Sequence, residues 1–121
     1  MAEKKTPKHD VWMPLYVSEY LGDTMHLTTE QHGAYLLLLM AAWKNDGKLP
    51  SDAGALQQIC RLTTQQWARH ERTLQSFFFV TESFWIQNRV RKELEKAKAN
   101  VEKKSRAGQA SAAARWGLRH E

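Results

Sequence analysis

The chain has 121 residues, of which 42% are hydrophobic and 26% are charged, a composition that suits one small domain with tails. Its formal net charge of +5 is unevenly distributed. Residues 1–8 carry three lysines and one glutamate, residues 9–88 carry five basic and eight acidic side chains, and residues 89–121 carry ten basic and four acidic ones. Basic ends on a mildly acidic body are common in nucleic-acid binders, although solubility alone also accounts for them.

No segment has the features of a membrane span or a signal peptide. The longest apolar run, residues 34–43, has ten residues, whereas a transmembrane helix needs about 20. The chain opens with the polar sequence AEKKTPK after Met1, and no apolar segment follows it. Cys60 is the single cysteine, so it cannot form an internal disulfide, and we expect a buried structural thiol rather than a reactive one. We therefore expect a cytoplasmic protein.

The first 23 residues are expected to hold little regular structure. Residues 1–10 are polar and charged, which predicts a flexible basic arm. Pro14 interrupts the apolar segment that follows, which predicts a short extended piece and then one helical turn after Ser18. This turn should end near Gly22 and Asp23.

A long helix is predicted to form the centre of the core. Thr28 and Gln31 have the spacing of a capping box, which predicts the start of this helix. The sequence GAYLLLLMAAWKN continues it, and Gly47 is a natural residue to end it. Because the helix is apolar nearly all round, it should be buried.

Two short helices joined by a tight turn are predicted over residues 51–76. The first, SDAGALQQICR, should be capped by Ser51. The second should start at about Thr64, because Thr63 and Gln66 have the spacing of a second capping box. A turn of three or four residues between two helices is typical of a helix-turn-helix.

The second of these helices has one apolar and one polar face. Trp67, Leu74 and Phe78 recur at spacings of seven and four and predict the core stripe, with Ala68 nearby. The side chains expected to face outward, all suited to contact base edges and phosphates, are Gln65, Arg69, Arg72 and Thr73. This face makes the helix a candidate recognition helix.

Residues 77–88 change to a strand-like pattern. The sequence reads FFFV, then TES, then FWIQN, which predicts two short strands with a three-residue connection. Trp85 alternates with Phe84 and Ile86, so we expect Trp85 to point away from the core. Three helices followed by a hairpin are the order of a winged helix, in which the hairpin is the wing.

The C-terminal part is predicted to be a basic helix from Arg89 to about Lys104, followed by an Ala-rich segment. The thin apolar stripe of this helix consists of Val90, Leu94, Ala97 and Val101. It can pack on the domain, or on a partner helix in a homodimer formed through residues 90–104. The segment SRAGQASAAARWG should be frayed or disordered alone, and its Trp116 is the expected contact with a partner.

The predicted fold class is therefore mainly α with a small β-hairpin, a winged helix-turn-helix followed by a basic C-terminal helix. We divide the chain into a flexible basic arm at residues 1–10, a winged-helix domain at residues 11–90 and a basic, Ala-rich tail at residues 91–121 that is helical or partly disordered.

The sequence contains no signature of an enzyme or of a cofactor or metal site. It has no GxxxxGK[ST] loop, no GxGxxG and no HExxH, and its five histidines lack a metal-ligand spacing. His26 and His32 are expected to pack or cap at the start of the long helix. Glu30 is expected there because a carboxylate is favoured in a first helical turn.

Several segments together resemble the YdaU family of prophage proteins. They are MPLYVSEYLGDTMHLTTEQHGAYLLLLMAAWKNDGKLPSD at residues 13–52, Leu62-Thr63 with Trp67, the hairpin, and KSRAGQASAAARWG at residues 104–117. The family is a domain of unknown function, and its members are similar to the N-terminal winged-helix modules of phage replication-initiation proteins. The resemblance implies a role in phage replication initiation or its regulation and supplies no catalytic motif.

The leading hypothesis is a DNA-binding protein, with duplex DNA favoured. Gln65, Arg69, Arg72 and Thr73 would contact the major groove, and the hairpin near Glu82 and Ser83 would lie alongside. The expected phosphate contacts are Arg89, Arg91, Lys92, Lys103, Lys104, Arg106 and Arg115, with Lys4 and Lys5 of the arm. The alternative is a protein–protein adaptor that recruits a helicase or a helicase loader without binding DNA, with Trp116 as its partner contact.

Overall fold

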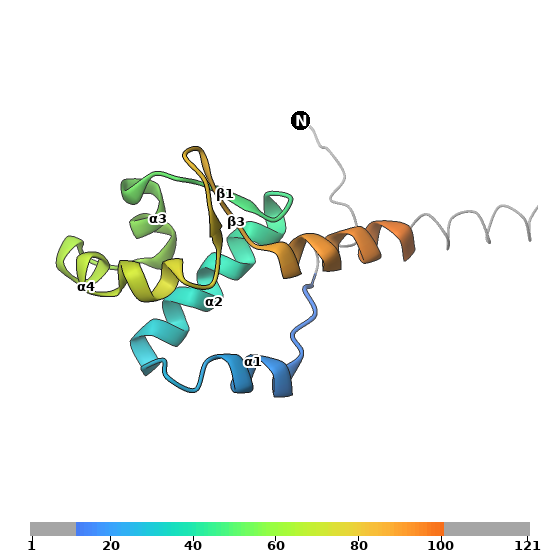
Figure 1. Cartoon of the computed structure of the whole chain (residues 1–121), viewed down its shortest axis with the longest axis horizontal. Helices are drawn as coiled ribbons and strands as arrows, with labels where there is room; N and C mark the ends of the chain where they lie inside the picture. The colour runs from blue at the N-terminus through green and yellow to red at the C-terminus, as the bar shows by residue number, and fades with distance from the viewer. Residues whose placement is uncertain (1–11, 101–121) are drawn as a thin grey trace, which may run out of the picture.

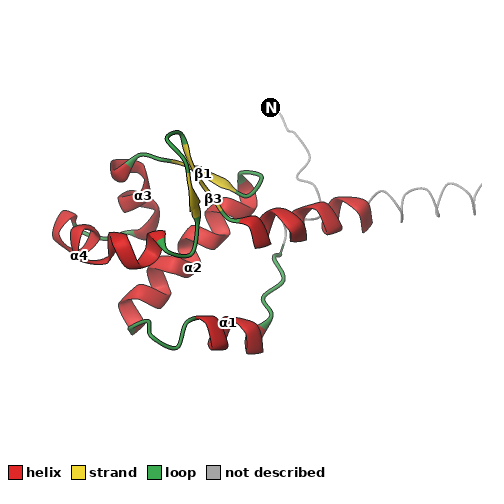
Figure 2. Ribbon diagram, viewed as in Figure 1, coloured by secondary structure: helices red, strands yellow, loops and turns green. Residues whose placement is uncertain are grey.

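The computed structural model describes residues 12–100 of the chain (Figure 1). The elements, in order, are α1 (Val17–Asp23), α2 (Thr29–Lys44), β1 (Lys48–Pro50), α3 (Ala53–Cys60), α4 (Thr64–Gln75), β2 (Phe79–Val80), β3 (Phe84–Ile86) and a helix over residues 88–100. Within the described range the protein is mostly helical with one small antiparallel sheet (Figure 2), which confirms a mainly α class with a small β-hairpin.

Helix α2 is the central helix, as predicted. Its capping box is formed, with Thr28 as the N-cap and Gln31 bonding back to the Thr28 amide. Six of its side chains are buried: Ala34, Tyr35, Leu38, Leu39, Ala42 and Trp43. The apolar run therefore supplies the centre of the core, against which the other elements pack.

Gly47 ends the turn after α2 in a conformation and a space that favour glycine. Its φ is +83°, in the left-handed region. A Cβ atom built on Gly47 would lie 2.1 Å from Cγ of Arg91, so the helix over residues 88–100 packs directly against this turn. The Gln87 amide also donates to the Gly47 carbonyl at 2.8 Å, which fixes the start of that helix beside β1.

Helices α3 and α4 are joined by residues 61–63, which confirms the predicted tight turn. The predicted cap of α3 was wrong, because the N-cap is Asp52 rather than Ser51. The Asp52 carboxylate accepts from the Gly54 amide at 3.0 Å, whereas the Ser51 amide donates to the Ser83 carbonyl at 2.9 Å. Ser51 thus continues the edge of the sheet, and the helix begins one residue later than expected.

The predicted hairpin is confirmed, with residues 81–83 connecting β2 and β3. The sheet also contains β1, which was not predicted from the sequence, and the strand order is β1-β3-β2 with both pairings antiparallel. Strand β1 has three residues and ends at Pro50, so it is too short to show a period of two in the sequence. Its pairing with the distant β3, in the register Lys48↔Ile86 and Leu49↔Trp85, is what makes it a strand.

The expectation that Trp85 points away from the core was wrong. Trp85 is 3% exposed and lies in the middle strand, opposite Leu49 and Val80. Its ring centroid is 5.4 Å from that of Phe78 and 5.9 Å from that of Trp67. Alternation along β3 therefore turns Trp85 inward and Phe84 outward, the reverse of the predicted orientation.

The structure also differs from the sequence-based expectations for Ala68 and for the first helix. Ala68, expected near the core stripe, is exposed on α4. Helix α1 starts at Val17, before Ser18, and buries none of its seven residues, so it lies at the periphery of the fold. Among the described residues, no helix is long and apolar enough to cross a membrane.

The helix over residues 88–100 packs on the body through its apolar stripe. Val90 and Leu94 are buried in the core cluster, and Ala97 is partly buried against it. Val101 lies outside the described residues, as do the arm at residues 1–10 and most of the tail. The predicted homodimer through residues 90–104 stays a prediction, and three of its four stripe residues already pack against the core of the same chain.

The position of Trp85 is tested by substitution. Trp85→Ala should lower the free energy of unfolding by about 3–5 kcal/mol, because it leaves a cavity between Trp67 and Phe78. The control is Phe84→Ala at the neighbouring exposed position, which should cost about 1 kcal/mol or less. Urea denaturation measures both, and equal losses for the two variants would contradict a buried Trp85.

Candidate nucleic-acid interface

Helix α4 presents the predicted polar face to solvent. Gln65, Arg69 and Arg72 are exposed and Thr73 is half-buried, whereas Trp67, His70 and Leu74 are buried on the opposite side. Arg69 keeps 62% of its side chain accessible. The structure thus places the four predicted recognition residues on one side of α4, with three of them exposed.

Capping boxes fix the start of both α2 and α4. Thr63 accepts from the Gln66 amide at 3.1 Å, and the side chain of Gln66 accepts from the Thr63 amide at 2.8 Å. Thr28 and Gln31 make the corresponding bonds at the start of α2, at 3.2 and 2.9 Å. In both boxes the glutamine uses its carbonyl oxygen on the cap, which leaves its amide nitrogen free to donate elsewhere.

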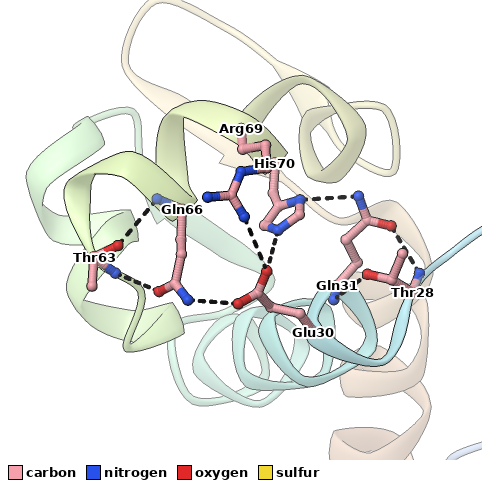
Figure 3. Close-up of polar contacts among 7 residues, drawn as sticks. All are labelled: Thr28, Glu30, Gln31, Thr63, Gln66, Arg69 and His70. Carbon is pink, nitrogen blue, oxygen red and sulfur yellow. Dashed lines mark hydrogen bonds and ion pairs between the residues drawn. The ribbon is translucent and has the colours of Figure 1, made fainter.

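The two capping boxes are joined to each other through Glu30 and His70 (Figure 3). The amide nitrogen of Gln66 donates to Oε2 of Glu30 at 2.6 Å. Nε2 of His70 lies 2.5 Å from Oε1 of the same carboxylate. On the other side, the amide nitrogen of Gln31 lies 3.1 Å from Nδ1 of His70. We call these four residues, Glu30, Gln31, Gln66 and His70, the cross-helix network.

The cross-helix network assigns the proton on His70. The amide group of Gln31 can only donate, because its carbonyl oxygen already accepts from Thr28, so Nδ1 of His70 must accept. The ring proton then lies on Nε2 and is donated to Glu30. The His70 side chain is only 8% exposed, and both of its ring nitrogens have hydrogen-bond partners, which offsets the loss of hydration on burial.

Arg69 adjoins the cross-helix network at its solvent side. Its Nη1 lies 3.8 Å from Oε1 of Glu30, at the outer limit of an ion pair. Such a pair between exposed groups contributes little to stability. The guanidinium of Arg69 therefore stays largely in solvent, where its donors can reach a ligand.

The turn before α4 adds a further basic side chain. Arg61 ends α3 in the left-handed conformation, with φ of 57°, and its guanidinium donates to the Ile59 carbonyl. Gln57 reaches across the turn to donate to the hydroxyl of Thr64 at 3.2 Å. The exposed surface formed by Arg61, Gln65, Arg69 and Arg72 therefore carries three positive charges.

The predicted phosphate contacts of the C-terminal helix lie apart from α4. Figure 1 shows α4 at one end of the molecule and the helix over residues 88–100 leading away from it at the other. Arg89 forms ion pairs with Glu19 and, at 3.6 Å, with Asp23 of α1. Arg91 and Lys92 are exposed, and Arg91 packs over Gly47. Lys4, Lys5, Lys103, Lys104, Arg106, Arg115 and Trp116 lie outside the described residues.

The hairpin loop is held near the start of α3 rather than extending freely. Glu82 and Ser83 are exposed, and the Ser83 carbonyl accepts from the Ser51 amide. Thr81 closes the loop by accepting from the Phe84 amide and donating to the Phe84 carbonyl. A candidate wing is thus present, but it is short and bonded back to the body.

Cys60, His26 and His32 have structural surroundings. Cys60 is buried, and burial raises the pKa of its thiol to about 12, in agreement with the predicted structural role. His32 pairs with the hydroxyl of Tyr20 at 2.8 Å, and His26 stacks on Phe77. Within residues 12–100, no group of three or more His, Cys, Asp or Glu side chains is arranged to hold a metal ion.

A small cavity of about 60 Å³ lies between α1, α2 and the C-terminal helix. Tyr35 and Trp43 line it on one side and Tyr16 and Glu93 on the other, and the hydroxyl of Tyr16 donates to Glu93 at 3.1 Å. Burial is the main cause that raises the pKa of Tyr35 to about 12. The space suffices for a few water molecules rather than for a substrate.

The importance of Glu30 and His70 could not be recognised from the sequence. In the sequence alone, the helix dipole accounts for Glu30, and no motif assigns a role to His70. The two residues are 40 positions apart, and no local spacing relates them. The one available signal was that each lies near a capping residue, with Glu30 next to Gln31 and His70 one turn after Gln66.

The fold and this surface define a small, mainly helical domain. Residues 11–95 match the family described as "Protein of unknown function (DUF1376)", and the chain belongs to this family. Over 104 residues it is 42% identical to "Uncharacterized protein YdaU" of Escherichia coli (strain K12), an alignment that covers 86% of this chain and 36% of that protein. The chain thus spans about a third of the length of this curated relative, and the resemblance to the YdaU family is confirmed. No solved structure matches.

The cross-helix network is tested by a double-mutant cycle. Glu30→Ala should lower the free energy of unfolding by about 1–3 kcal/mol, because it leaves the buried His70 donor unsatisfied. Combining it with His70→Ala should cost less than the sum of the two single variants, by about 1 kcal/mol, because the second change removes the orphaned group. Gln65→Ala, on the exposed face of α4, should stay within about 0.5 kcal/mol of the parent protein. Strictly additive losses would show that Glu30 and His70 do not interact.

Proposed function

We propose that the protein binds duplex DNA through a winged helix-turn-helix. In this proposal α4 is the recognition helix and the β2–β3 hairpin is the wing. The observation that carries it is the order α2, β1, α3, α4, β2, β3, with the strands arranged β1-β3-β2. Two helices joined by a three-residue turn and followed by a hairpin are the parts of a winged helix-turn-helix.

The side chains of α4 support the proposal chemically. A recognition helix reads base edges with its N-terminal residues, and Gln65 lies in the first turn of α4. Glutamine suits adenine, and arginine suits guanine or phosphate. Arg69 and Arg72 follow on the same exposed side, one and two turns further along. The cross-helix network would hold this face rigid, which lowers the entropic cost of binding.

The biological role proposed here rests on the family resemblance. A prophage protein similar to the winged-helix modules of replication-initiation proteins would act in replication initiation or its regulation. Such a protein would work in the cytoplasm, where the DNA lies, and would need neither a cofactor nor catalytic activity of its own.

A second candidate function is an adaptor that recruits a helicase or a helicase loader. The observation that favours it is the apolar surface at the N-terminal end of the described range. Its exposed side chains are Trp12, Leu15, Tyr16, Val17, Leu21 and Met25, and α1 buries none of its residues. Exposed apolar patches of this kind mark sites of protein contact.

The recognition-helix assignment is tested by fluorescence anisotropy with labelled duplex DNA at low salt. Replacing both Arg69 and Arg72 by alanine should weaken binding and flatten the dependence of log K on log salt by about two units, because each arginine bound to a phosphate contributes about one unit to that slope. The control replaces Lys96 and Lys98 by alanine, which removes the same charge from the far helix.

The control pair should retain most of the binding. If the control pair weakens binding as much as the α4 pair does, the effect is one of net charge, and α4 has no special role. If the parent protein binds no duplex at all, the DNA proposal fails and the adaptor is favoured.

A further inference from the structure

The sheet has one buried and one solvent-facing side. Leu49, Val80 and Trp85 lie side by side in register and pack into the core. Alternation places the remaining sheet residues on the opposite side. These residues, Lys48, Pro50, Phe79, Phe84 and Ile86, form what we call the outer sheet face.

The outer sheet face exposes two aromatic rings beside a cation. Phe79 is 61% exposed and Phe84 is 37% exposed. In register, Phe79 lies opposite Ile86, and Phe84 precedes Ile86 by two residues. Phe79 and Phe84 are therefore diagonal neighbours, a relation in which backbone positions are typically about 7–8 Å apart, within reach of aromatic side chains. The ammonium of Lys48 lies 4.6 Å from the centroid of the Phe84 ring.

The composition of this face fits a nucleic acid better than a protein. Single exposed apolar residues are ordinary, but two adjacent exposed aromatic rings with a lysine are not. Among the described residues Lys48 forms no ion pair, so its charge is directed at the ring and is not neutralised by a carboxylate. Aromatic rings on a sheet that stack bases, with basic side chains on the phosphates between them, are a common way to hold unpaired strands.

We infer that the outer sheet face binds single-stranded DNA. Phe79 and Phe84 each stack on one base, and Lys48, which lies on the β1 side of Phe84, moves from the ring to the phosphate next to the base on Phe84. This inference rests on the proposed function, because α4 is assigned there to duplex DNA. The substrate class is then a junction, at which one part of the protein holds paired DNA and the other holds an unpaired strand.

The experiment compares a labelled thymine oligonucleotide with a labelled duplex by fluorescence anisotropy. Replacing both Phe79 and Phe84 by alanine should weaken oligonucleotide binding at least tenfold, since stacking contributes about 1–3 kcal/mol per base. Duplex binding should weaken far less than oligonucleotide binding, because Arg69 and Arg72 of α4 are intact in this variant. Lys48→Ala should flatten the salt dependence for the oligonucleotide by about 0.7 units, the value for one phosphate of a single strand.

Two further pairs of variants separate stacking from other effects. Replacing both phenylalanines by tyrosine should preserve oligonucleotide binding, because tyrosine stacks equally well. Replacing both Leu21 and Met25 by alanine, which removes exposed apolar side chains from another surface, should have no effect. If the tyrosine pair loses as much binding as the alanine pair, or the alanine pair loses none, the inference is wrong.

Cross-linking on the unaltered protein keeps the inference testable even where a variant fails to fold. An iodouracil-substituted oligonucleotide, irradiated in the complex, should attach to Phe79 or Phe84, as mapped by mass spectrometry. Attachment only elsewhere overturns the inference. Duplex binding without oligonucleotide binding refutes the outer sheet face alone, whereas binding to neither refutes the proposed function and favours a protein partner for this surface.

Discussion

One carboxylate, that of Glu30, joins α4 to the central helix α2 by directional hydrogen bonds. Glu30, in the first turn of α2, accepts from Gln66 and from His70 of α4, and so joins the two helices at the point where each begins. Because the glutamines of both capping boxes take part, the bonds that start the helices also fix their relative position. The apolar core beneath, with Leu38 and Leu74 fully buried, packs the two helices together, and the directional bonds of Glu30 add to that packing.

The same network separates the two sides of α4. His70 and Trp67 face inward, so Arg69 and Arg72 must face outward. A rigid helix with its polar side chains in solvent has little conformational entropy to lose on binding. The peripheral α1 is different, because ion pairs with Arg89 and a few half-buried side chains attach it. The leading proposal, DNA binding, therefore concerns α4, whose position is fixed by the cross-helix network and the core, rather than the peripheral α1.

Features that depend on a few neighbouring residues could be predicted from the sequence. Both capping boxes, the turn at Gly47 and the hairpin connection follow from local hydrogen bonding and backbone preference. Features that depend on residues distant in the chain could not be predicted in this way. Strand β1 exists because β3 pairs with it, and Trp85 is buried because β3 became the middle strand.

Some features of the candidate site could likewise be predicted from local sequence, and others depend on distant residues. The exposed residues of α4 follow from helical periodicity, since Trp67 and Leu74 define the buried side. The bonds of Glu30 with His70 link positions 40 residues apart and leave no periodic trace. The outer sheet face likewise required the strand register, because the alternation in FWI fits either orientation of Trp85 until the neighbouring strands are known.

The most direct test of the central claim is an NMR titration of the protein with duplex DNA. If α4 is the recognition helix, the largest amide shift changes will fall on residues 61–72 and on the hairpin loop at residues 81–83. Amides of α1 and of residues 88–100 will change little. Changes confined to α1 and residues 88–100, with α4 unaffected, would contradict the account.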